Sequence, residues 1–220
     1  MRRDVITSAI GIVVLTILLG LAYPLVITGI GQVAFPGNAN GQKIYVKGKL
    51  VGSKIIGQSF RTPVLEKNGK PKEEEEEVVT EAVPKYFQSR PSATEGGAYN
   101  AAASTFSNRG PNDKVTEEDD AENIKEYLEL NKPYDQTLTV AQIPVDAVNT
   151  SASNLDPEIS PANARIQAHR VAAKRGLSLG VVDRLVSDYT DARGLGFSGE
   201  PGVNVLELNL ALDRMTEGKS

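Results

Sequence analysis

Few residues in this chain have the types and spacing that catalysis needs. Gly-Leu-Gly-Phe-Ser-Gly at 194–199 matches the GxGxxG pattern of dinucleotide-binding sites. That mechanism requires a strand before the glycines and, after them, a helix N-terminus that receives the pyrophosphate. Here a predicted helix precedes the motif and Glu200-Pro201 follows it, so the sequence favours a helix-to-strand turn. The segment also fails the Gly-x-Ser-x-Gly nucleophile elbow, because Glu200 stands in place of the last glycine.

Metal, thiol and phosphate chemistry also lack their residues. The chain has no cysteine and one histidine, His169, which excludes disulfides, thiolate zinc ligands and HExxH zinc sites. It contains no Walker-type loop, no Asp-Lys-Thr-Gly-Thr phosphorylation motif of P-type ATPases and no Thr-Val-Gly-Tyr-Gly potassium filter. If the protein belongs to an ion pump, it is not the subunit that handles phosphate. An anchored hydrolase is disfavoured, since no nucleophile–base pair is evident.

Basic residues gather on one predicted helix near its C-terminal end. His169 lies one turn after Arg165 and beside Arg170, and Lys174 and Arg175 follow. Such a face could pair with an acidic partner surface. The pattern favours an ordinary solvated face, with cations placed well for the helix C-terminus.

The clearest structural element is an apolar N-terminal segment. No charge occurs between Asp4 and Lys43, and roughly Val5 to Ile30 is almost wholly apolar. At about 1.5 Å per residue, a helix of that length exceeds a hydrocarbon core about 30 Å thick. A cleaved secretory signal would have a shorter apolar core and a small-residue cleavage site, and a buried core helix would be shorter. A permanent membrane anchor is therefore favoured.

The charges that flank the anchor predict its orientation. Arg2 and Arg3 precede it, so the positive-inside rule places the N-terminus in the cytosol and everything after about Ile30 outside. Tyr23 suits a membrane interface, and Pro24 would end or kink the helix near the outer boundary. We predict a cytosolic stub and anchor over 1–34 and one extracytosolic domain over 35–220. The anchor residues singled out are Val5, Leu15, Leu19, Tyr23 and Pro24.

Composition limits what the outer part can bind. The net charge of the chain is −4; residues 2–4 contribute +1 on the inner side, so about −5 remains outside. This balance argues against nucleic acid or anionic lipid as the main partner. About 185 residues outside the anchor suffice for one domain with its own core.

The middle of the chain alternates between short elements and loops. Loose alternation from Ile44 to Gly57 predicts a hairpin that turns near 47–49. An insertion near 67–84 carries the run Glu73 to Glu77, which predicts a solvated, mobile segment. Residues 91–112 predict an irregular loop, and 117–130 a helix.

The C-terminal third shows the most regular pattern. Ser160-Pro161 predicts a helix start, and Gly176 its end near Arg175. Ser178 begins a second predicted helix. Alternation over 203–210 predicts a half-buried strand, although Leu206 breaks its phase. The predicted fold class is a single transmembrane helix followed by one mixed α+β domain.

Several segments together resemble one family, the C subunit of the bacterial Kdp high-affinity potassium-transporting P-type ATPase. They span nearly the whole chain in the family's order, and jointly they are specific although each alone is weak. The segments are Leu-Ala-Tyr-Pro at 21–24, Gly-Ser-Lys-Ile-Ile-Gly-Gln-Ser-Phe at 52–60, Tyr-Phe-Gln-Ser-Arg-Pro-Ser-Ala at 86–93, Ile-Pro-Val-Asp at 143–146, Leu-Asp-Pro-Glu-Ile-Ser-Pro at 155–161, Arg-Val-Ala-Ala-Lys-Arg-Gly-Leu-Ser at 170–178 and residues 199–213.

The chain departs from the family in two places. The Glu-rich insertion between Phe60 and Tyr86 is longer than expected. Ser-Asn-Arg-Gly-Pro at 107–111 carries Arg109 where the family has Leu, and the region that follows, to about Asp135, matches poorly. Partner contacts made by that loop in the family do not carry over.

The resemblance implies a non-catalytic accessory subunit in a bacterial cell membrane. The family assembles with a channel-like subunit that selects potassium, a P-type subunit that hydrolyses ATP, and a small helical subunit. The family is also described as a catalytic chaperone that raises the pump's affinity for ATP. The predicted topology leaves only about four polar residues on the ATP side, so we expect ATP and potassium to act through the complex, with no cofactor or metal bound directly.

Two hypotheses remain: an assembly subunit of a potassium-importing pump, and a membrane-anchored extracytosolic binding or sensing module with a concave pocket. In the domain, candidate residues for partner contacts or structural roles are Asp156, Pro157, Ser160, Pro161, Arg170, Glu200, Pro201 and Asn204. Capping is the expected role of most of them. Glu200 and Asn204 are the better candidates for specific polar contacts.

Overall fold

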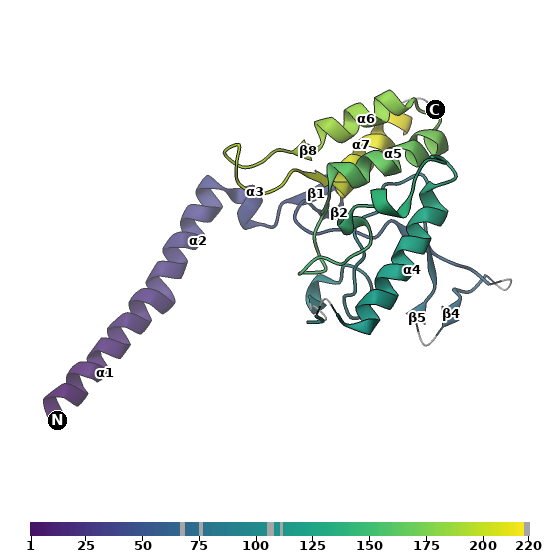
Figure 1. Cartoon of the computed structure of the whole chain (residues 1–220). Helices are drawn as coiled ribbons and strands as arrows, with labels where there is room; N and C mark the ends of the chain where they lie inside the picture. The colour runs from purple at the N-terminus through teal and green to yellow at the C-terminus, as the bar shows by residue number, and fades with distance from the viewer. Residues whose placement is uncertain (67–68, 75–76, 105–107, 111, 218–220) are drawn as a thin grey trace. The chain divides into compact units, whose positions relative to one another are not determined.

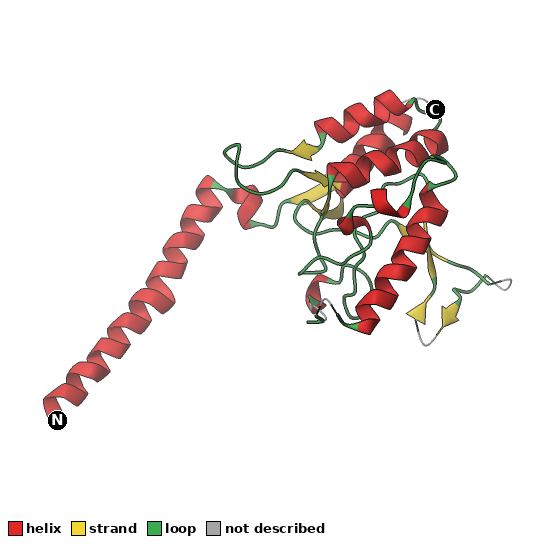
Figure 2. Ribbon diagram, viewed as in Figure 1, coloured by secondary structure: helices red, strands yellow, loops and turns green. Residues whose placement is uncertain are grey.

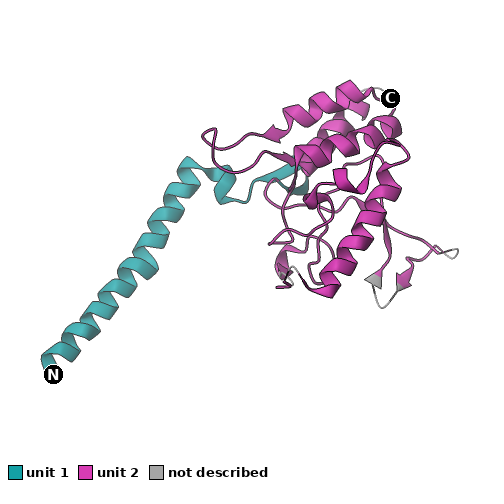
Figure 3. Cartoon of the chain, in the orientation of Figure 1, with its two compact units in different colours: residues 1–53 teal, residues 54–220 magenta. Residues whose placement is uncertain are grey.

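A computed structural model describes residues 1–66, 69–74, 77–104, 108–110 and 112–217. The chain combines helices with short strands (Figures 1 and 2), and its first helix is apolar enough to span a membrane, which confirms the predicted fold class. It divides into two compact units, Met1–Ser53 and Lys54–Ser220 (Figure 3). The division falls later than the predicted boundary at 34/35, because the first hairpin groups with the N-terminal helix.

The first unit begins with one long helical element. It consists of α1 (Arg2–Ile17), the π-helical turn η1 (Leu18–Ala22) and α2 (Tyr23–Ala34), and no residue of these segments is buried. The 33 residues have a mean hydropathy of 2.6 in their most apolar window. At about 1.5 Å per residue they extend about 50 Å, longer than a bilayer core.

The helix continues through Pro24, where the sequence predicted an end or a kink. Proline lacks an N–H and its ring crowds the carbonyl four residues earlier. The π-helical turn lies directly before it, and there the Tyr23 N–H bonds to the Leu18 carbonyl, five residues back. A π-turn widens the helix locally, so the chain continues as a helix for another turn and more.

After α3 (Pro36–Ala39), the unit closes with the predicted hairpin. Strands β1 (Lys43–Val46) and β2 (Lys49–Ser53) pair antiparallel. The connecting residues Lys47 and Gly48 have φ values of 49° and 78°. Two consecutive positive φ angles define the type I′ turn that suits two-residue hairpins.

The second unit has its main core between helices and a small sheet. Strands β7 (Glu158–Ile159), β9 (Gly202–Asn204) and β8 (Thr190–Asp191) form an antiparallel sheet in the order β7-β9-β8. Helices α5 (Pro161–Arg175), α6 (Leu179–Asp188) and α7 (Val205–Glu217) pack around it (Figure 1). The buried apolar residues are Phe87, Ile159, Ala164, Ala168, Val171, Ala172, Val182, Val186, Val203, Val205, Leu208 and Leu212.

Both predicted helices of this region are confirmed. The Ser160 hydroxyl accepts the Asn163 N–H at 3.1 Å, Pro161 is the first helical residue, and Gly176 ends α5 with a φ of 63°. Only a residue that tolerates a left-handed backbone ends a helix in this way without strain. Ser178 is the N-cap residue of α6.

The strand predicted over 203–210 is wrong for most of its length. Strand β9 stops at Asn204 and helix α7 begins at Val205. The Asn204 carboxamide oxygen accepts the Glu207 N–H at 3.1 Å, as a helix N-cap does. Val205, Leu208 and Leu212 are buried at helical spacing. Leu206 broke the two-residue alternation of a strand, and this break was the sequence signal for a helix.

A second, smaller core lies under α4 (Lys114–Asn131), which confirms the predicted helix. It contains Tyr127, Leu138, Ala147 and Val148, and the short turns η3 (Val140–Gln142) and η4 (Val145–Ala147) close it. Asp113 caps α4 by accepting the N–H groups of Val115 and Thr116.

The Glu-rich insertion contains strands. β3 (Arg61–Pro63) pairs antiparallel with β6 (Thr80–Ala82), and β4 (Glu73–Glu74) with β5 (Glu77–Val78). Residues 67–68 and 75–76 of the insertion lie outside the described residues, as do 105–107 and 111 of the predicted loop 91–112. Of that loop, the described part forms only the short turn η2 (Ala101–Ala103).

Candidate functional site

The segment Pro84–Ser92, here called the central segment, has neither helix nor strand and is held by side-chain amides. The Asn209 carboxamide accepts the Phe87 N–H at 2.9 Å and donates to the Phe87 carbonyl at 2.9 Å. Gln167 does the same for Gln88, at 2.7 and 3.0 Å. Each amide satisfies both polar groups of one residue, as a paired strand would. Helices α5 and α7 thereby fix the central segment between them.

Arg170 anchors the start of the central segment. Its guanidinium donates to the carbonyls of Pro84 at 2.5 Å and Tyr86 at 2.8 Å, and to the side-chain oxygens of Asn131 at 2.9 Å and Gln167 at 2.7 Å. The residue is fully buried. Burial lowers the pKa of Arg170 to about 10, so it stays charged at neutral pH. Its acceptors in these four bonds are neutral groups.

The solvated basic face predicted for α5 is therefore wrong at two positions. Arg170 is buried, and the side chain of Arg175 is 4% exposed and bonds to Asp213 at 2.9 Å. Their partners come from segments distant in the sequence, which a charge pattern along one helix does not reveal. Arg165, on another face of the same helix, is exposed as expected.

A polar network continues from α5 to α4. The Tyr127 hydroxyl donates to Asn163 at 2.9 Å, and the Asn163 amide donates to Asp146 at 3.0 Å. Burial raises the pKa of Tyr127, which keeps its hydroxyl a donor. Asp146 also accepts the Ser160 N–H at 2.8 Å. The network joins the two cores. Asp146 and Ser160 lie in segments singled out in the sequence, whereas the roles of Tyr127 and Asn163 were missed.

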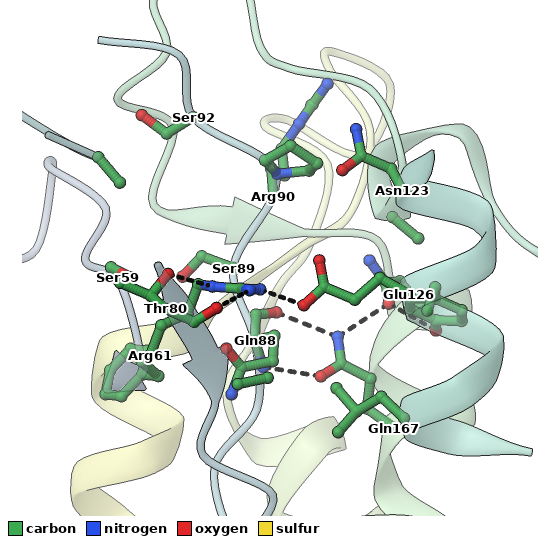
Figure 4. Close-up of a pocket in the computed structure, with 18 of the residues that line it drawn as sticks. Ser59, Arg61, Thr80, Gln88, Ser89, Arg90, Ser92, Asn123, Glu126 and Gln167 are labelled. Carbon is green, nitrogen blue, oxygen red and sulfur yellow. Dashed lines mark hydrogen bonds and ion pairs between the residues drawn. The ribbon is translucent and has the colours of Figure 1, made fainter. Parts of the chain in front are cut away.

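Beside the central segment lies a cavity of about 280 Å³. Figure 4 shows its labelled lining residues, which come from β3 and Ser59 just before it, β6, the central segment, α4 and α5. Arg61 donates to Glu126 at 2.5 Å and to the Thr80 hydroxyl and carbonyl at 2.9 and 2.8 Å. Arg90 pairs with Asp156 at 3.4 Å and donates to the Thr150 carbonyl at 3.2 Å.

The charged groups beside this cavity are paired with one another. Arg61 bonds to Glu126 and Arg90 to Asp156, so each of the two guanidinium groups in the lining is matched by a carboxylate. The Tyr99 hydroxyl donates to the Arg90 carbonyl at 2.7 Å, and burial raises the pKa of Tyr99 to about 12. Across the described residues, no group of three or more His, Cys, Asp or Glu side chains could hold a metal ion.

The structure places most of the predicted domain residues in structural roles. Asp156 accepts the Glu158 N–H at 3.0 Å, and the Pro157 carbonyl accepts the Val205 N–H at 3.1 Å. Asn204 is 3% exposed and uses its amide N–H on the Lys54 carbonyl at 2.8 Å. Glu200 and Pro201 lie in the loop between β8 and β9, where Glu200 is exposed. The anchor residues Val5, Leu15, Leu19, Tyr23 and Pro24 all lie exposed on the first helix.

The GxGxxG segment does not form a phosphate site. It lies in the loop that joins β8 to β9, and strand β9 follows it. No helix N-terminus is presented by the residues after it, which the dinucleotide mechanism requires. The predicted helix-to-strand turn is a hairpin connection within the sheet, because the two residues of β8 intervene after α6.

These features define a class of protein. One apolar helix is followed in the chain by an α+β domain, in which buried amide side chains and a buried arginine hold the central segment. The family described as "KdpC: K+-transporting ATPase, c chain" matches residues 5–214. The KdpC subunit of the potassium-transporting ATPase of Mycobacterium tuberculosis strain H37Rv is 43% identical over 215 residues, 98% of this chain and 100% of that protein. Those of Koribacter versatilis and Methylococcus capsulatus are each 44% identical, over 97% and 93% of this chain and 95% and 94% of their own lengths.

The chain belongs to the KdpC family of potassium-transporting ATPase subunits. This confirms the resemblance drawn from the ordered sequence segments. Two of those segments now have a physical explanation: residues 86–93 overlap the central segment, and 199–213 include the asparagines that cap α7 and hold Phe87.

Proposed function

We propose that this chain is a non-catalytic accessory subunit that assembles and stabilises an ATP-driven potassium importer. Family membership over residues 5–214 is the observation that carries the proposal. Its partners would be the potassium-selecting channel-like subunit, the ATP-hydrolysing subunit and the small helical subunit of the same pump.

The proposed topology has the N-terminus in the cytosol and the second unit outside the membrane. It is supported by the apolar helix Arg2–Ala34 and by the positive residues at its start. In that orientation the domain lies across the bilayer from ATP. An effect on ATP affinity then arises from different binding free energies for different pump states, without contact with the nucleotide.

The absence of cysteine offers a direct test of topology. Glu129→Cys introduces a single thiol on an exposed position of α4, and Asp4→Cys one at the N-terminus. In intact cells a membrane-impermeant maleimide should label Cys at 129 and not at 4, and both after lysis. Labelling of position 4 alone would reverse the orientation and with it the outer-face role.

The assembly role is tested by deletion. Cells that express the other pump subunits with and without this chain are compared for complex recovery and potassium uptake at micromolar potassium. We expect loss of both without the chain, restored by the wild-type chain supplied separately. A complex that forms and transports equally well without the chain would refute the proposal.

The alternative, an anchored binding module, has the cavity in its favour. At about 280 Å³ it lies at the small end of ligand pockets, and the charged groups of Arg61 and Glu126 in its wall are already bonded to one another. We therefore favour the assembly role. The alternative would be favoured by a small molecule that stabilises the isolated wild-type chain and gives no stabilisation in the Arg61→Ala variant.

A further inference from the structure

The loop Arg193–Glu200, here called the 193–200 loop, is fixed by its own backbone. Gly194 and Ser198 exchange both N–H···O bonds at 2.8 Å, and the Gly196 N–H bonds to the Arg193 carbonyl at 3.0 Å. An Arg193–Glu200 ion pair of 2.6 Å spans its base. These bonds are local, so the shape of the loop depends on few residues outside it.

This rigid loop presents two large apolar side chains to solvent. Leu195 is 90% exposed and Phe197 75%, the highest values among the described large apolar residues of the second unit. Single exposed apolar residues are common on protein surfaces. Two adjacent ones on a preorganised turn resemble the rigid anchors that fill pockets at interfaces.

The backbone conformation at Leu195 also favours a role in contacts outside the chain. Leu195 and Gly196 have φ values of 53° and 81°, which form a type I′ turn. Asparagine or glycine would suit the first of these positions, whereas leucine is disfavoured there. At 90% exposure the Leu195 side chain buries little surface within the domain, so a role in contacts outside the chain would account for both its conformation and its exposure.

We infer that Leu195 and Phe197 dock into an apolar pocket with a basic rim on another subunit of the pump. This inference rests on the proposed function. Residues 188–200 carry three carboxylates, of which Glu200 pairs with Arg193 at 2.6 Å and Asp191 lies 3.8 Å from Lys54, so the surface around the loop keeps a net charge of −1. An anionic bilayer surface attracts basic segments and would repel this one, while Lys and Arg around a pocket complement it.

The test uses the full chain expressed with the other pump subunits. Leu195→Asn suits the positive φ, so it should keep the fold while removing one apolar contact; Leu195→Asn with Phe197→Ser removes both. Val145→Ser is the matched control, since Val145 is 72% exposed elsewhere on the same unit. Retention of the chain on a tagged pump subunit is measured, with thermal unfolding of each purified chain as the check on folding.

We expect the double variant to lose retention about tenfold or more, and Leu195→Asn less, with unfolding temperatures unchanged and Val145→Ser retained like wild type. Photocross-linking from a benzophenone amino acid at position 197 should yield an adduct with another pump subunit. Normal retention of the double variant, or adducts with lipid alone, would overturn the inference and leave the assembly role standing. If the wild-type chain is not retained, the proposed function fails and the inference with it.

Discussion

The central segment and the 193–200 loop are both irregular stretches of the second unit, but they are ordered in opposite ways. The central segment makes its backbone bonds to side chains of α5 and α7, which lie about 80 and 120 residues away in the sequence. The 193–200 loop makes its bonds to itself. Phe87 is fully buried, while Phe197 is 75% exposed.

This difference predicts that the central segment serves the stability of the fold and that the 193–200 loop serves contacts with other chains. The central segment loses its shape when a distant side chain changes, so mutations there should act on folding. The 193–200 loop depends on few neighbours, so mutations there should leave folding intact and act on contacts with other chains. The predictions below test this division from the largest expected effect to the smallest.

The largest effect is expected from Arg170→Ala. It removes the guanidinium donor from two backbone carbonyls and two amide oxygens in a buried site, although the Tyr86 carbonyl and the Gln167 oxygen each keep a bond from Gln88. The free energy of unfolding should fall by about 3–5 kcal/mol. Chemical unfolding of the full chain in detergent, followed by circular dichroism, measures it. Arg165→Ala on the exposed face of α5 is the control and should change stability by less than about 0.5 kcal/mol. Equal stability of the two variants would contradict the anchoring role.

Asn209→Ala should have the next largest effect. It removes the partners of both the Phe87 N–H and the Phe87 carbonyl, at a cost of about 2–3 kcal/mol. Hydrogen exchange, read by mass spectrometry, should accelerate in the peptide that holds residues 84–92 and stay unchanged over 193–200. Arg214→Ala, exposed on the same helix, is the control. Acceleration in both peptides would show that the two regions are not independent.

Local sequence rules were sufficient for helices and hairpins whose ends and turns are set by neighbouring residues. The helix Pro161–Arg175 followed from a capping serine, a proline and a glycine, and the first hairpin from its turn. The rule failed at 203–210, where apolar residues of α7 alternate over a few positions and only the longer spacing of Val205, Leu208 and Leu212 reveals a helix. At Pro24 the rule allowed an end or a kink, and the helix continues there after a π-turn.

The candidate site was predictable only in part. Its motif 86–93 was recognised, but the side chains that hold it, Gln167, Asn209 and Arg170, act across the fold. Asn209 offered one signal, a polar residue flanked by leucines on a face that otherwise packs inward. Arg170 was a candidate through the family segment 170–178, but its burial was not predictable, because a buried arginine with neutral partners has the same local sequence context as a solvated one.

A smaller effect is expected on the 193–200 loop. Leu195→Asn should leave the free energy of unfolding unchanged or raise it by up to about 1 kcal/mol, because asparagine tolerates the positive φ of that position. Leu195→Val, with a branched side chain at the same φ, should lower it by a similar amount. Thermal unfolding of the purified chains decides the order. A loss of stability in Leu195→Asn would show that the exposed leucine supports the fold, which would end the contrast with the central segment.

The smallest effect concerns the sheet that carries both ends of the 193–200 loop. Burial, with the charges of Asp156 and Asp191 added, raises the pKa of Glu158 on β7 above its ordinary value of 4.5. The folded state therefore binds this proton more tightly than the unfolded state. The resulting stability is fully present below pH 4.5 and is lost as the pH rises through the raised value.

Glu158→Gln cannot titrate, so its stability relative to wild type should increase as the pH is raised from below 4.5 towards neutrality. The change should not exceed about 0.5 kcal/mol, because solvent screens a half-buried carboxyl. Urea unfolding at a series of pH values measures it, with Glu129→Gln on an exposed position of α4 as the control. A relative stability that stays constant or falls over this range would mean that Lys54, the cation facing Glu158, outweighs burial at the base of the loop.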